Sequence, residues 1–484
     1  MGKITNLFGF DNSYAGLPQR FFSKQNPRPV AAPKLIKFNA SLAAELGLQL
    51  NGKTDEYLAQ FFSGNEIPSG AEPIALAYAG HQFGGFSILG DGRAVLLGEI
   101  IAANGTRFDI QLKGSGQTAF SRGGDGRAGL GPVLREYIIS EAMHALGVPT
   151  ARSLAAVVTG EQIYREAAID GAIVTRVAAS HIRFGTFEYF AAKNDFDGLK
   201  IVADYAITRH YPNISKSENP YLELLREVAK SQAFLVAKWM NIGFIHGVMN
   251  TDNMLISGET IDYGPCAFMD NYDPKTVYSS IDRHGRYRFE NQPIIAQWNL
   301  ARLAEALLPL IDADVVKAVK ACEEIIAEFP TIYQENCLEN MQAKLGLALN
   351  EDGDLALAQE FLDILHTNQL DYTNSFRQLL DFAKGEIVPR EFEQWSKKWQ
   401  IRRTKEVNNP EEMSRLIQEN NPAFIPRNHL VEEAIVAASQ NANFAPFEEL
   451  ISVLANPYAD TSGSEHYRTP PRTDQIVTAT FCGT

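Results

Sequence analysis

The pattern of apolar residues changes along this chain, and that change limits the folds it can adopt more than any other feature. Between residues 75 and 180, short β-type runs such as Ala94–Ile101 and Phe108–Lys113 alternate with glycine-rich turns. Apolar residues then recur at helical spacing in Tyr221–Met240, and helix follows helix after Ala296. A β-rich part followed by a helical part is an α+β arrangement, and the hinge between the parts is the natural place for a ligand.

Glycine and proline mark the ends of individual predicted elements. The turn Gly90-Asp91-Gly92-Arg93 lies between Ser87–Leu89 and Ala94–Ile101 and predicts a β-hairpin. Pro132 opens a helix that ends at Gly147. The other predicted elements are strands Ala151–Thr159, Glu161–Glu166 and Ala172–Val177, and helices Ala40–Leu46, Trp298–Leu308, Ala313–Glu328, Leu357–Leu365, Leu430–Ala438 and Pro446–Leu454.

Composition and charge exclude several classes of protein. The 484 residues are 45% apolar and 21% charged, which is typical of a globular enzyme. The net charge of −14 repels nucleic acid backbones, so no nucleic acid partner is expected. The four cysteines form no CxxC pair and no zinc-ligand pattern. Without a secretion signal or an apolar run near 18 residues, we expect a cytoplasmic protein with no membrane partner. The sequence does not set the oligomeric state, and a monomer is the default expectation.

Two features of the β-rich part suggest phosphate binding. Glycines in the Gly90–Arg93 turn would let backbone amides approach an anion closely, although such a turn needs no ligand. Lys113 ends a strand and is followed 23 residues later by Glu136 in the first turn of a helix. A strand lysine and a helix glutamate can form the ion pair that holds nucleotide phosphates, although Lys113 by itself reads as a surface lysine.

Two further features lie between the first long helix and the later ones. The loop His246–Ile256 contains adjacent Asp252 and Asn253, which could supply Mg²⁺ ligands and a catalytic base, or could form only an Asx-rich turn. Nine residues after Asn253, Asp262 is followed by Tyr263 and a glycine. Each feature is ordinary alone, whereas four in this order point to a nucleotide site.

The order of these features is that of protein kinases, with one departure. His246 and Asn253 keep the spacing of the H-R-D-x-x-x-x-N catalytic loop, but Val248 occupies the position of the kinase aspartate. Valine cannot accept or orient a substrate hydroxyl. The chain is therefore either an inactive kinase fold, or Asp252 has taken over as the base with a different reaction geometry.

The chain resembles the selenoprotein O family of kinase-like protein adenylyltransferases (YdiU-like). The resemblance implies a protein-kinase-like bilobal fold: an N-terminal extension (1–70), a β-rich N-lobe (71–185), a helical C-lobe (186–330), and a mostly helical C-terminal extension with a flexible tail (331–484). The segments that carry it are HQFGGFSILGDGRAVLLGE (81–99), QLKGSGQTAFSRGGDGRA (111–128), LREYIISEAMHALGVPT (134–150), TRVAASHIRFGTFE (175–188), FIHGVMNTDNMLISGETIDYGP (244–265), QPIIAQWNLARLAEAL (292–307) and NPAFIPRN (421–428).

The resemblance implies an activity and a set of site residues. Members of the family transfer AMP from ATP to hydroxyl groups of proteins and release pyrophosphate, with ATP flipped relative to kinases. For this chain it implies ATP as substrate, Mg²⁺ or Mn²⁺ as cofactor, and protein partners carrying Ser, Thr or Tyr hydroxyls. Asp252 corresponds to the catalytic base and Asn253 and Asp262 to the metal ligands. The nucleotide contacts would be Gly90, Gly92, Arg93, Lys113, Asp125, Gly126, Glu136, Arg176, Arg183 and Asp262.

Two alternatives to the adenylyltransferase remain open on the sequence. A phosphotransferase would move the γ-phosphate of ATP instead of AMP. A catalytically silent pseudokinase scaffold would bind ATP without turnover and would not need Asp252. The absence of the usual base at Val248 favours the silent scaffold, whereas retention of Lys113, Asn253 and Asp262 counts against it.

Cysteines near the site and at the chain end suggest redox regulation. Eukaryotic members of the family carry selenocysteine near the end, where this chain has Cys482. A disulfide between Cys266 and Cys482 would tie the tail, which we expect to be loose from Asn456, across the segment equivalent to a kinase activation loop. The alternative is two unrelated thiols. Elsewhere we expect a structural hydrogen bond at His81, and core positions for Trp298, Trp395 and Trp399.

Overall fold

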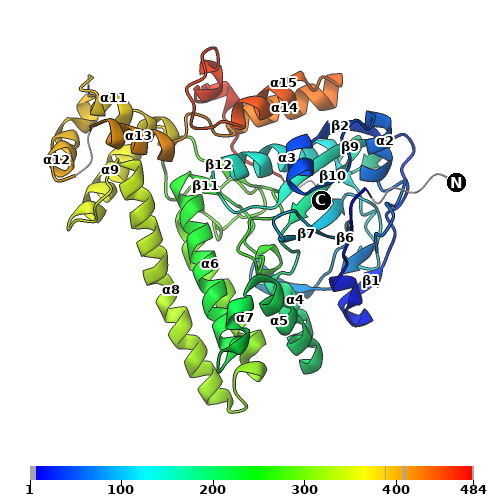
Figure 1. Ribbon diagram of the computed structural model, residues 1–484. Coiled ribbons are helices and arrows are strands. Elements are labelled where there is room, and N and C mark those ends of the chain that lie inside the picture. Colours follow the sequence, from blue (N-terminus) through cyan, green and yellow to red (C-terminus); the bar gives the residue numbers. More distant parts are fainter. Residues whose placement is uncertain (1–6, 387, 407–409, 482–484) are drawn as a thin grey trace.

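The computed structural model describes residues 7–386, 388–406 and 410–481 (Figure 1). An N-terminal antiparallel sheet precedes a mostly helical C-terminal part. This arrangement confirms the predicted α+β class. Figure 1 shows the sheet on one side of the molecule and the long helices α6, α7 and α8 beside it.

The main sheet has the strand order β1-β3-β6-β7-β10-β9-β2, with β8 paired to β10. On the central strands β7 and β10, Lys113 pairs with Val174 and Arg176 with Gln111. Side chains two residues apart share a face, so Lys113 and Arg176 project from the same face of the sheet. The strands are β1 Phe22–Lys24, β2 Lys34–Phe38, β3 Ile74–Leu76, β6 Ala94–Ile101, β7 Arg107–Lys113, β8 Ala128–Gly129, β9 Arg152–Tyr164 and β10 Ala168–Ala178.

The predicted hairpin across residues 90–93 is wrong. Instead, β4 (Ala79–Gln82) pairs with β5 (Gly85–Ile88), while β6 pairs with β3 and β7. Phe83 and Gly84 form the turn of this β4–β5 hairpin, with left-handed φ values of 51° and 87°. Such consecutive positive φ angles match the twist of a two-residue hairpin, so the chain reverses there and residues 90–93 become a connection between sheets.

The predicted break in the following strand is also wrong. Ala151–Thr159 and Glu161–Glu166 were expected as two strands, but one strand, β9, runs from Arg152 to Tyr164. Gly160 adopts a φ of 71°, and the register with β10 shifts opposite Gly171. The glycine is therefore accommodated as an irregularity within a continuous strand and does not end it.

All the predicted helices are present, and α8 continues through Pro330 well beyond its expected end. The helices are α1 Ala40–Glu45, α2 Asp55–Phe62, α3 Leu130–Ala145, α4 Phe184–Ala192, α5 Phe196–His210, α6 Pro220–Asn241, α7 Gln292–Ile311, α8 Val315–Lys344, α9 Asp354–Asn368, α10 Tyr372–Arg377, α11 Leu379–Ala383, α12 Glu393–Arg403, α13 Pro410–Asn420, α14 Asn428–Asn441 and α15 Ala445–Leu454.

Helix α3 lies at the centre of the N-terminal part. One side contacts β9 and β10, and the other is covered by α14 and α15, which are drawn in orange in Figure 1. Glu136 on α3 faces the sheet, where it contacts Lys113, and is only 3% exposed. Tyr137 on the same helix contacts Phe447 of α15, so the C-terminal helices bury the outer side of α3.

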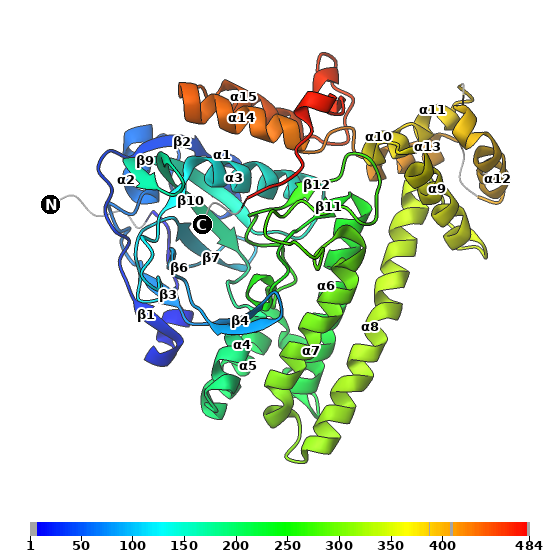
Figure 2. The same cartoon turned by 180° about the vertical axis from the view of Figure 1, so that it is seen from behind.

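Helices α6, α7 and α8 form the largest core with α4 and α5, and α9–α13 gather at one end of α8 (Figure 2). The residues Phe289–Ile311, which include α7, form the only described helix long and apolar enough to cross a membrane. Half of that window is buried, against α4, α6 and α8, as expected for a core helix. Trp395 and Trp399 are fully buried, as predicted, whereas Trp298 is partly exposed.

Two short strands frame the loop that the sequence singles out. β11 (Phe244–Ile245) pairs antiparallel with β12 (Ala267–Phe268), so the chain between them is held at both ends. Within it, Thr251–Asn253 forms a single 3₁₀ turn, labelled η4. Hairpin β4–β5 contacts η4 and α4, and Figure 2 shows β4 beside α4.

Candidate active site

Four charged side chains from distant segments meet in a buried cluster, which we call the central cluster. Lys113 Nζ lies 2.6 Å from Glu136 Oε2 and 2.9 Å from Asp262 Oδ1. Arg176 Nη1 lies 2.6 Å from the same Asp262 oxygen and 3.5 Å from Glu136 Oε1. The sheet supplies both cations, α3 supplies Glu136, and the β11–β12 loop supplies Asp262.

Asp262 is held in its ionised form by these cations. Burial alone would raise the pKa of its carboxyl group, but the charges of Lys113, Arg176 and Arg183 outweigh burial and hold that pKa well below its ordinary value. Its backbone is left-handed, with a φ of 60°, which is uncommon for a residue with a side chain. Packing around the loop therefore fixes the carboxylate in an otherwise unfavoured conformation.

Arg183 extends the central cluster toward the connection that contains Asp91. Its Nη2 lies 3.6 Å from Asp91 Oδ1 and 3.9 Å from Asp262 Oδ2. Its guanidinium carbon lies 4.3 Å from the ring centre of Tyr78, and the residue is 1% exposed. Arg183 Nε is buried with no hydrogen-bond partner among the described residues. A buried arginine with unused donor capacity is suited to an anionic ligand.

Sequence analysis treated Asp91 only as a turn residue and missed its place in the site. Its Oδ2 accepts hydrogen bonds from Leu76 N at 3.2 Å and from Gln111 Nε2 at 3.0 Å. Burial raises the pKa of Asp91, and the charge of Arg183 opposes that rise. A carboxylate between two glycines was the available signal, but its partners lie 15 residues or more away.

Asp252 lies on the η4 turn beside this cluster and is 8% exposed. Its Oδ2 accepts a weak hydrogen bond from Gln82 Nε2 at 3.4 Å, whereas Oδ1 is buried with no partner in the described part of the chain. Burial raises the pKa of Asp252 to about 6. A Cβ atom on Gly80 would overlap the Asp252 carboxyl group, so only glycine lets β4 pack this closely. The free oxygen is placed to accept a proton.

The loop around Asp252 is fixed by its own polar residues. His246 Nε2 lies 2.9 Å from Ile261 O, which joins the loop to the segment carrying Asp262. Asn253 Nδ2 donates to Val248 O at 3.0 Å, so its side-chain carbonyl is the atom left for another partner. Val248 thus contributes its backbone to the loop, although its side chain has no acid–base chemistry.

His81 and Glu188 support the same loop from the hairpin side. His81 N donates to Thr251 Oγ1 at 2.7 Å, and Glu188 accepts from Thr251 Oγ1 and pairs with His81 Nδ1. The structural hydrogen bond expected at His81 is confirmed. Glu188, from α4, was not singled out in the sequence because nothing local distinguishes it from other helix residues.

The two predicted nucleotide loops lie against each other. Thr118 Oγ1 donates to Asp91 O at 2.6 Å, and Ser121 Oγ donates to Gly92 O. Gly90 has a φ of 103°, and a Cβ atom there would overlap the ring of Phe120. The loop at residues 114–127 therefore covers the connection at residues 90–93.

The remaining predicted nucleotide contacts lie on or beside these two loops, at varying distance from the central cluster. The carbonyl oxygen of Arg93 accepts from Gly114 N at 2.8 Å, next to Lys113. Gly126 O accepts from Gly116 N at 3.0 Å. Asp125 is exposed and pairs with Arg165 at 2.8 Å, so the structure does not bring its carboxylate into the cluster.

Cys266 is fully buried, and burial raises the pKa of its thiol to about 12. The last described residues return to this region, where Thr480 Oγ1 donates to Pro265 O and Thr480 N to Tyr278 O, each at 2.7 Å. Cys482 lies outside the described residues, so the predicted Cys266–Cys482 disulfide stays a prediction.

A sheet lysine paired with a helix glutamate, further buried arginines and two loop aspartates are typical of enzymes that transfer a group from a nucleoside triphosphate. Comparison with known proteins identifies which group is transferred. The family described as protein adenylyltransferase SelO matches residues 5–455. The chain belongs to this family and is a protein nucleotidyltransferase.

Similar proteins extend over the whole chain. A protein nucleotidyltransferase YdiU of Rhizobium johnstonii is 56% identical over 488 residues, covering 99% of this chain and 97% of its own. Proteins of the same description from Anoxybacillus flavithermus and Syntrophotalea carbinolica are each 54% identical, covering 99% of this chain and 99% and 98% of their own. The resemblance predicted from sequence segments is confirmed.

Proposed function

We propose that this adenylyltransferase moves AMP from ATP to Ser, Thr or Tyr hydroxyls of proteins, with Asp252 as the base. The observation that carries the proposal is the buried Oδ1 of Asp252 beside the central cluster, which has no hydrogen-bond partner in the part of the chain that the structure describes. The hydroxyl oxygen attacks the α-phosphorus and passes its proton to Asp252. The bond between the α-phosphorus and its bridging oxygen to the β-phosphate breaks, and pyrophosphate leaves.

Several cations are available for the phosphates. Lys113, Arg176 and Arg183 converge on Asp262, and Arg183 Nε has no hydrogen-bond partner among the described residues. We propose that these side chains grip the β- and γ-phosphates. Arg93 and the glycine loops, with Asp125 and Gly126, would contact the nucleotide from the other side. ATP flipped relative to kinases then presents its α-phosphate to the acceptor hydroxyl near Asp252.

The donor set fits a divalent cation of the Mg²⁺ type. Asp262 supplies an ionised carboxylate and Asn253 an amide oxygen, which are oxygen ligands that Mg²⁺ and Mn²⁺ accept. No three acidic, histidine or cysteine side chains are grouped for a metal among the residues described, so substrate phosphates would complete the ligand shell. The bound ion would neutralise charge on the departing pyrophosphate.

We further propose that the fold is that of a protein kinase in finer detail, with a β-rich N-lobe at residues 71–185 and a helical C-lobe at 186–330. The contacts that support this arrangement are the Lys113–Glu136 pair and the framed loop at Asp252. The segments 1–70 and 331–484 would be extensions of these lobes. A Cys266–Cys482 disulfide would hold the chain end near Pro265, where Thr480 already binds.

The test is label transfer from ATP carrying a label at the α- or the γ-phosphate, with Asp252→Ala as control. α-Label on protein that is absent with the variant supports AMP transfer with Asp252 as base. Label from the γ-phosphate alone would instead restore the phosphotransferase. ATP binding without any transfer, with Mg²⁺ or Mn²⁺ and a mixed protein pool, would favour the silent scaffold.

A further inference from the structure

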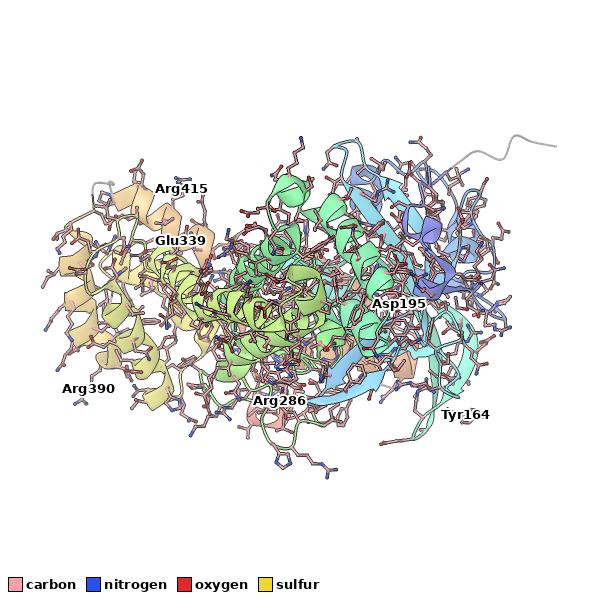
Figure 3. All side chains as sticks on the ribbon, turned by 90° about the horizontal axis from the view of Figure 1, so that it is seen from below. Tyr164, Asp195, Arg286, Glu339, Arg390 and Arg415 are labelled. Atoms are coloured by element: carbon pink, nitrogen blue, oxygen red, sulfur yellow. The ribbon has the colours of Figure 1, made fainter. Side chains whose placement is uncertain are left out.

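A cleft opens beside the loop that carries Asp252, and none of its lining residues belongs to the central cluster. We call it the 281–286 cleft, and its volume is about 560 Å³. One wall is Phe83 at the tip of hairpin β4–β5, the other is the segment that includes Ile281, Arg283 and Arg286, and Ile295 of α7 also lines it. Figure 3 labels Arg286 at this surface.

The walls of the cleft are tied directly to the catalytic loop. Asn250 Oδ1 accepts hydrogen bonds from Phe83 N at 3.1 Å and from Tyr287 OH at 2.7 Å. Asn250 is two residues before Asp252, and Gln82, the neighbour of Phe83, donates to Asp252 Oδ2. Any chain lying in the cleft would therefore be held at a fixed position relative to the proposed base.

The cleft is positively charged although the chain has a net charge of −14. Arg283, His284 and Arg286 line it, and none forms an ion pair with a described carboxylate. The one acidic lining residue, Asp282, directs its two oxygens to backbone amides at Arg286 (2.9 Å) and Tyr287 (2.7 Å). Asp282 keeps its negative charge, but the two arginines outnumber it, so the lining carries an excess of positive charge.

Arg286 is oriented by aromatic contacts. Its guanidinium carbon lies 4.8 Å from the ring centre of Trp298, whose side chain is partly exposed. Arg302 lies 4.9 Å from the same ring but pairs with Glu305 at 2.7 Å. Stacking positions Arg286 without neutralising it, so the arginine keeps its capacity for a carboxylate.

Exposed apolar residues accompany these cations. Phe83 is 39% exposed and Ile281 is 55% exposed, and both line the cleft. Grouped exposed apolar side chains next to unpaired charges are typical of surfaces that bind another protein. The chemistry that matches is a polypeptide segment with both acidic and apolar side chains.

We propose that the 281–286 cleft binds the acceptor segment of the protein substrate and selects segments in which acidic and apolar residues lie near the modified hydroxyl. The proposal rests on the function proposed above and names its substrate class. Arg283 attracts the acidic residues, the neighbouring His284 ring offers them a hydrogen bond, Arg286 orients a carboxylate, and Phe83 with Ile281 contacts the apolar residue. The tie through Asn250 sets the distance from this contact to Asp252.

The test uses random copolymers of glutamate and tyrosine, or of lysine and tyrosine, of equal length. Binding of dye-labelled copolymer is measured by fluorescence anisotropy without ATP, and AMP transfer is measured with α-labelled ATP. The charge-reversal variant carries Arg283→Glu and His284→Glu, both exposed positions. The matched control is Arg390→Glu, and Figure 3 shows Arg390 toward one end of the molecule, away from Arg286.

We expect the wild type to bind the acidic copolymer at least 10-fold more tightly than the basic one, with a preference that weakens as salt is added. The charge-reversal variant should raise the Kd and KM for the acidic copolymer at least 10-fold, leaving the Kd for ATP unchanged. Arg283→Lys with His284→Lys should keep the wild-type preference. Arg390→Glu should leave every value unchanged.

Three results would overturn the proposal. One is the absence of any preference for the acidic copolymer in binding. Another is a charge-reversal variant that behaves like Arg390→Glu. The third is a weakening of ATP binding by the same factor, which would assign the cleft to the nucleotide. Because binding is read without ATP, the proposed AMP transfer can fail in the labelling experiment while the cleft still binds the acidic copolymer.

Discussion

Two groups of cations lie near Asp252, and they differ in what surrounds them. In the central cluster, Lys113 and Arg176 are buried and lie within 3 Å of Asp262. In the 281–286 cleft, Arg283 is exposed and Arg286 is partly exposed, and neither forms an ion pair with a carboxylate that the structure describes. Positive charge is therefore found in two different environments within the candidate active site.

The difference teaches what each environment requires. A buried cation without a ligand needs an internal counterion, because desolvation of an unpaired charge costs several kcal/mol. An exposed cation stays hydrated and needs none, and it acts on partners through its field. Substitutions in the central cluster should thus affect both folding and chemistry, whereas those in the cleft should affect substrate choice alone.

Removing the shared counterion should produce the largest effect. Asp262→Ala leaves Lys113 and Arg176 buried without this carboxylate, which should lower the free energy of unfolding by about 3–5 kcal/mol. AMP transfer should fall at least about 100-fold, since a proposed metal ligand is lost as well. Denaturant unfolding and α-label transfer measure the two effects.

The matched control is Glu290→Ala, which removes a partly exposed carboxylate paired with Arg288 at 2.6 Å. Its effect on unfolding should stay below about 1 kcal/mol, as for surface ion pairs generally. Equal destabilisation by the two variants would contradict the contrast between buried and exposed cations.

Asp252 differs from the paired charges of the central cluster, because it is buried but makes no ion pair in the described structure. Asp252→Asn should lower the rate of AMP transfer by about 10²–10⁴-fold, the usual contribution of a general base. The free energy of unfolding should not fall, since burial already disfavours this charge. A combined loss of rate and stability would mean that Asp252 serves as a counterion and not as a base.

The sequence predicts those parts of the site that depend on local pattern. Alternation along β7 correctly placed Lys113 at a strand end, and its side chain meets that of Glu136 at 2.6 Å. The helix start predicted at Pro132 was wrong by two residues, because α3 begins at Leu130, and Glu136 therefore lies beyond its first turn. Long periodic helices were likewise predicted, because their apolar faces are visible over many turns. The family resemblance supplied the residue roles that local pattern does not.

Features that depend on distant pairing were missed. Two glycine-containing turns, at residues 83–84 and 90–93, carry similar local signals, and only the pairing of β6 with β3 and β7 decides between them. Gln82 and Asp252 are 170 residues apart in the chain and meet only when the hairpin packs on η4. No window of sequence contains both partners, so their contact has no local signature.

Glu259 is a partly buried carboxylate that forms no ion pair in the described structure, and it behaves differently from Asp262. Glu259, three residues before Asp262, accepts hydrogen bonds from Ala179 N at 3.0 Å and Ser257 Oγ at 2.8 Å. Burial raises the pKa of Glu259 from its ordinary 4.5 to about 7, the opposite of the shift at Asp262. The folded protein therefore binds a proton here between pH 4.5 and 7 that the unfolded chain does not bind.

The stability contributed by this proton is present below pH 4.5 and is lost as the pH rises through 7. Glu259→Gln keeps an acceptor for both donors without the charge. The variant should therefore match the wild type near pH 5 and exceed its free energy of unfolding by about 2 kcal/mol at pH 8. Denaturant unfolding at both pH values measures this, and a pH-independent difference would show that Glu259 is already ionised when folded.

The smallest effect on stability is expected for an exposed cation of the 281–286 cleft. Arg283→Ala removes a cation with no ion pair to a described carboxylate, so the free energy of unfolding should change by less than about 0.5 kcal/mol. Thermal unfolding at low and high salt measures this. A loss above about 1 kcal/mol would mean that Arg283 has an internal partner and is not free for a substrate. If stability is retained, any change in substrate preference comes from the surface of the cleft itself, because the fold that positions Asp252 is intact.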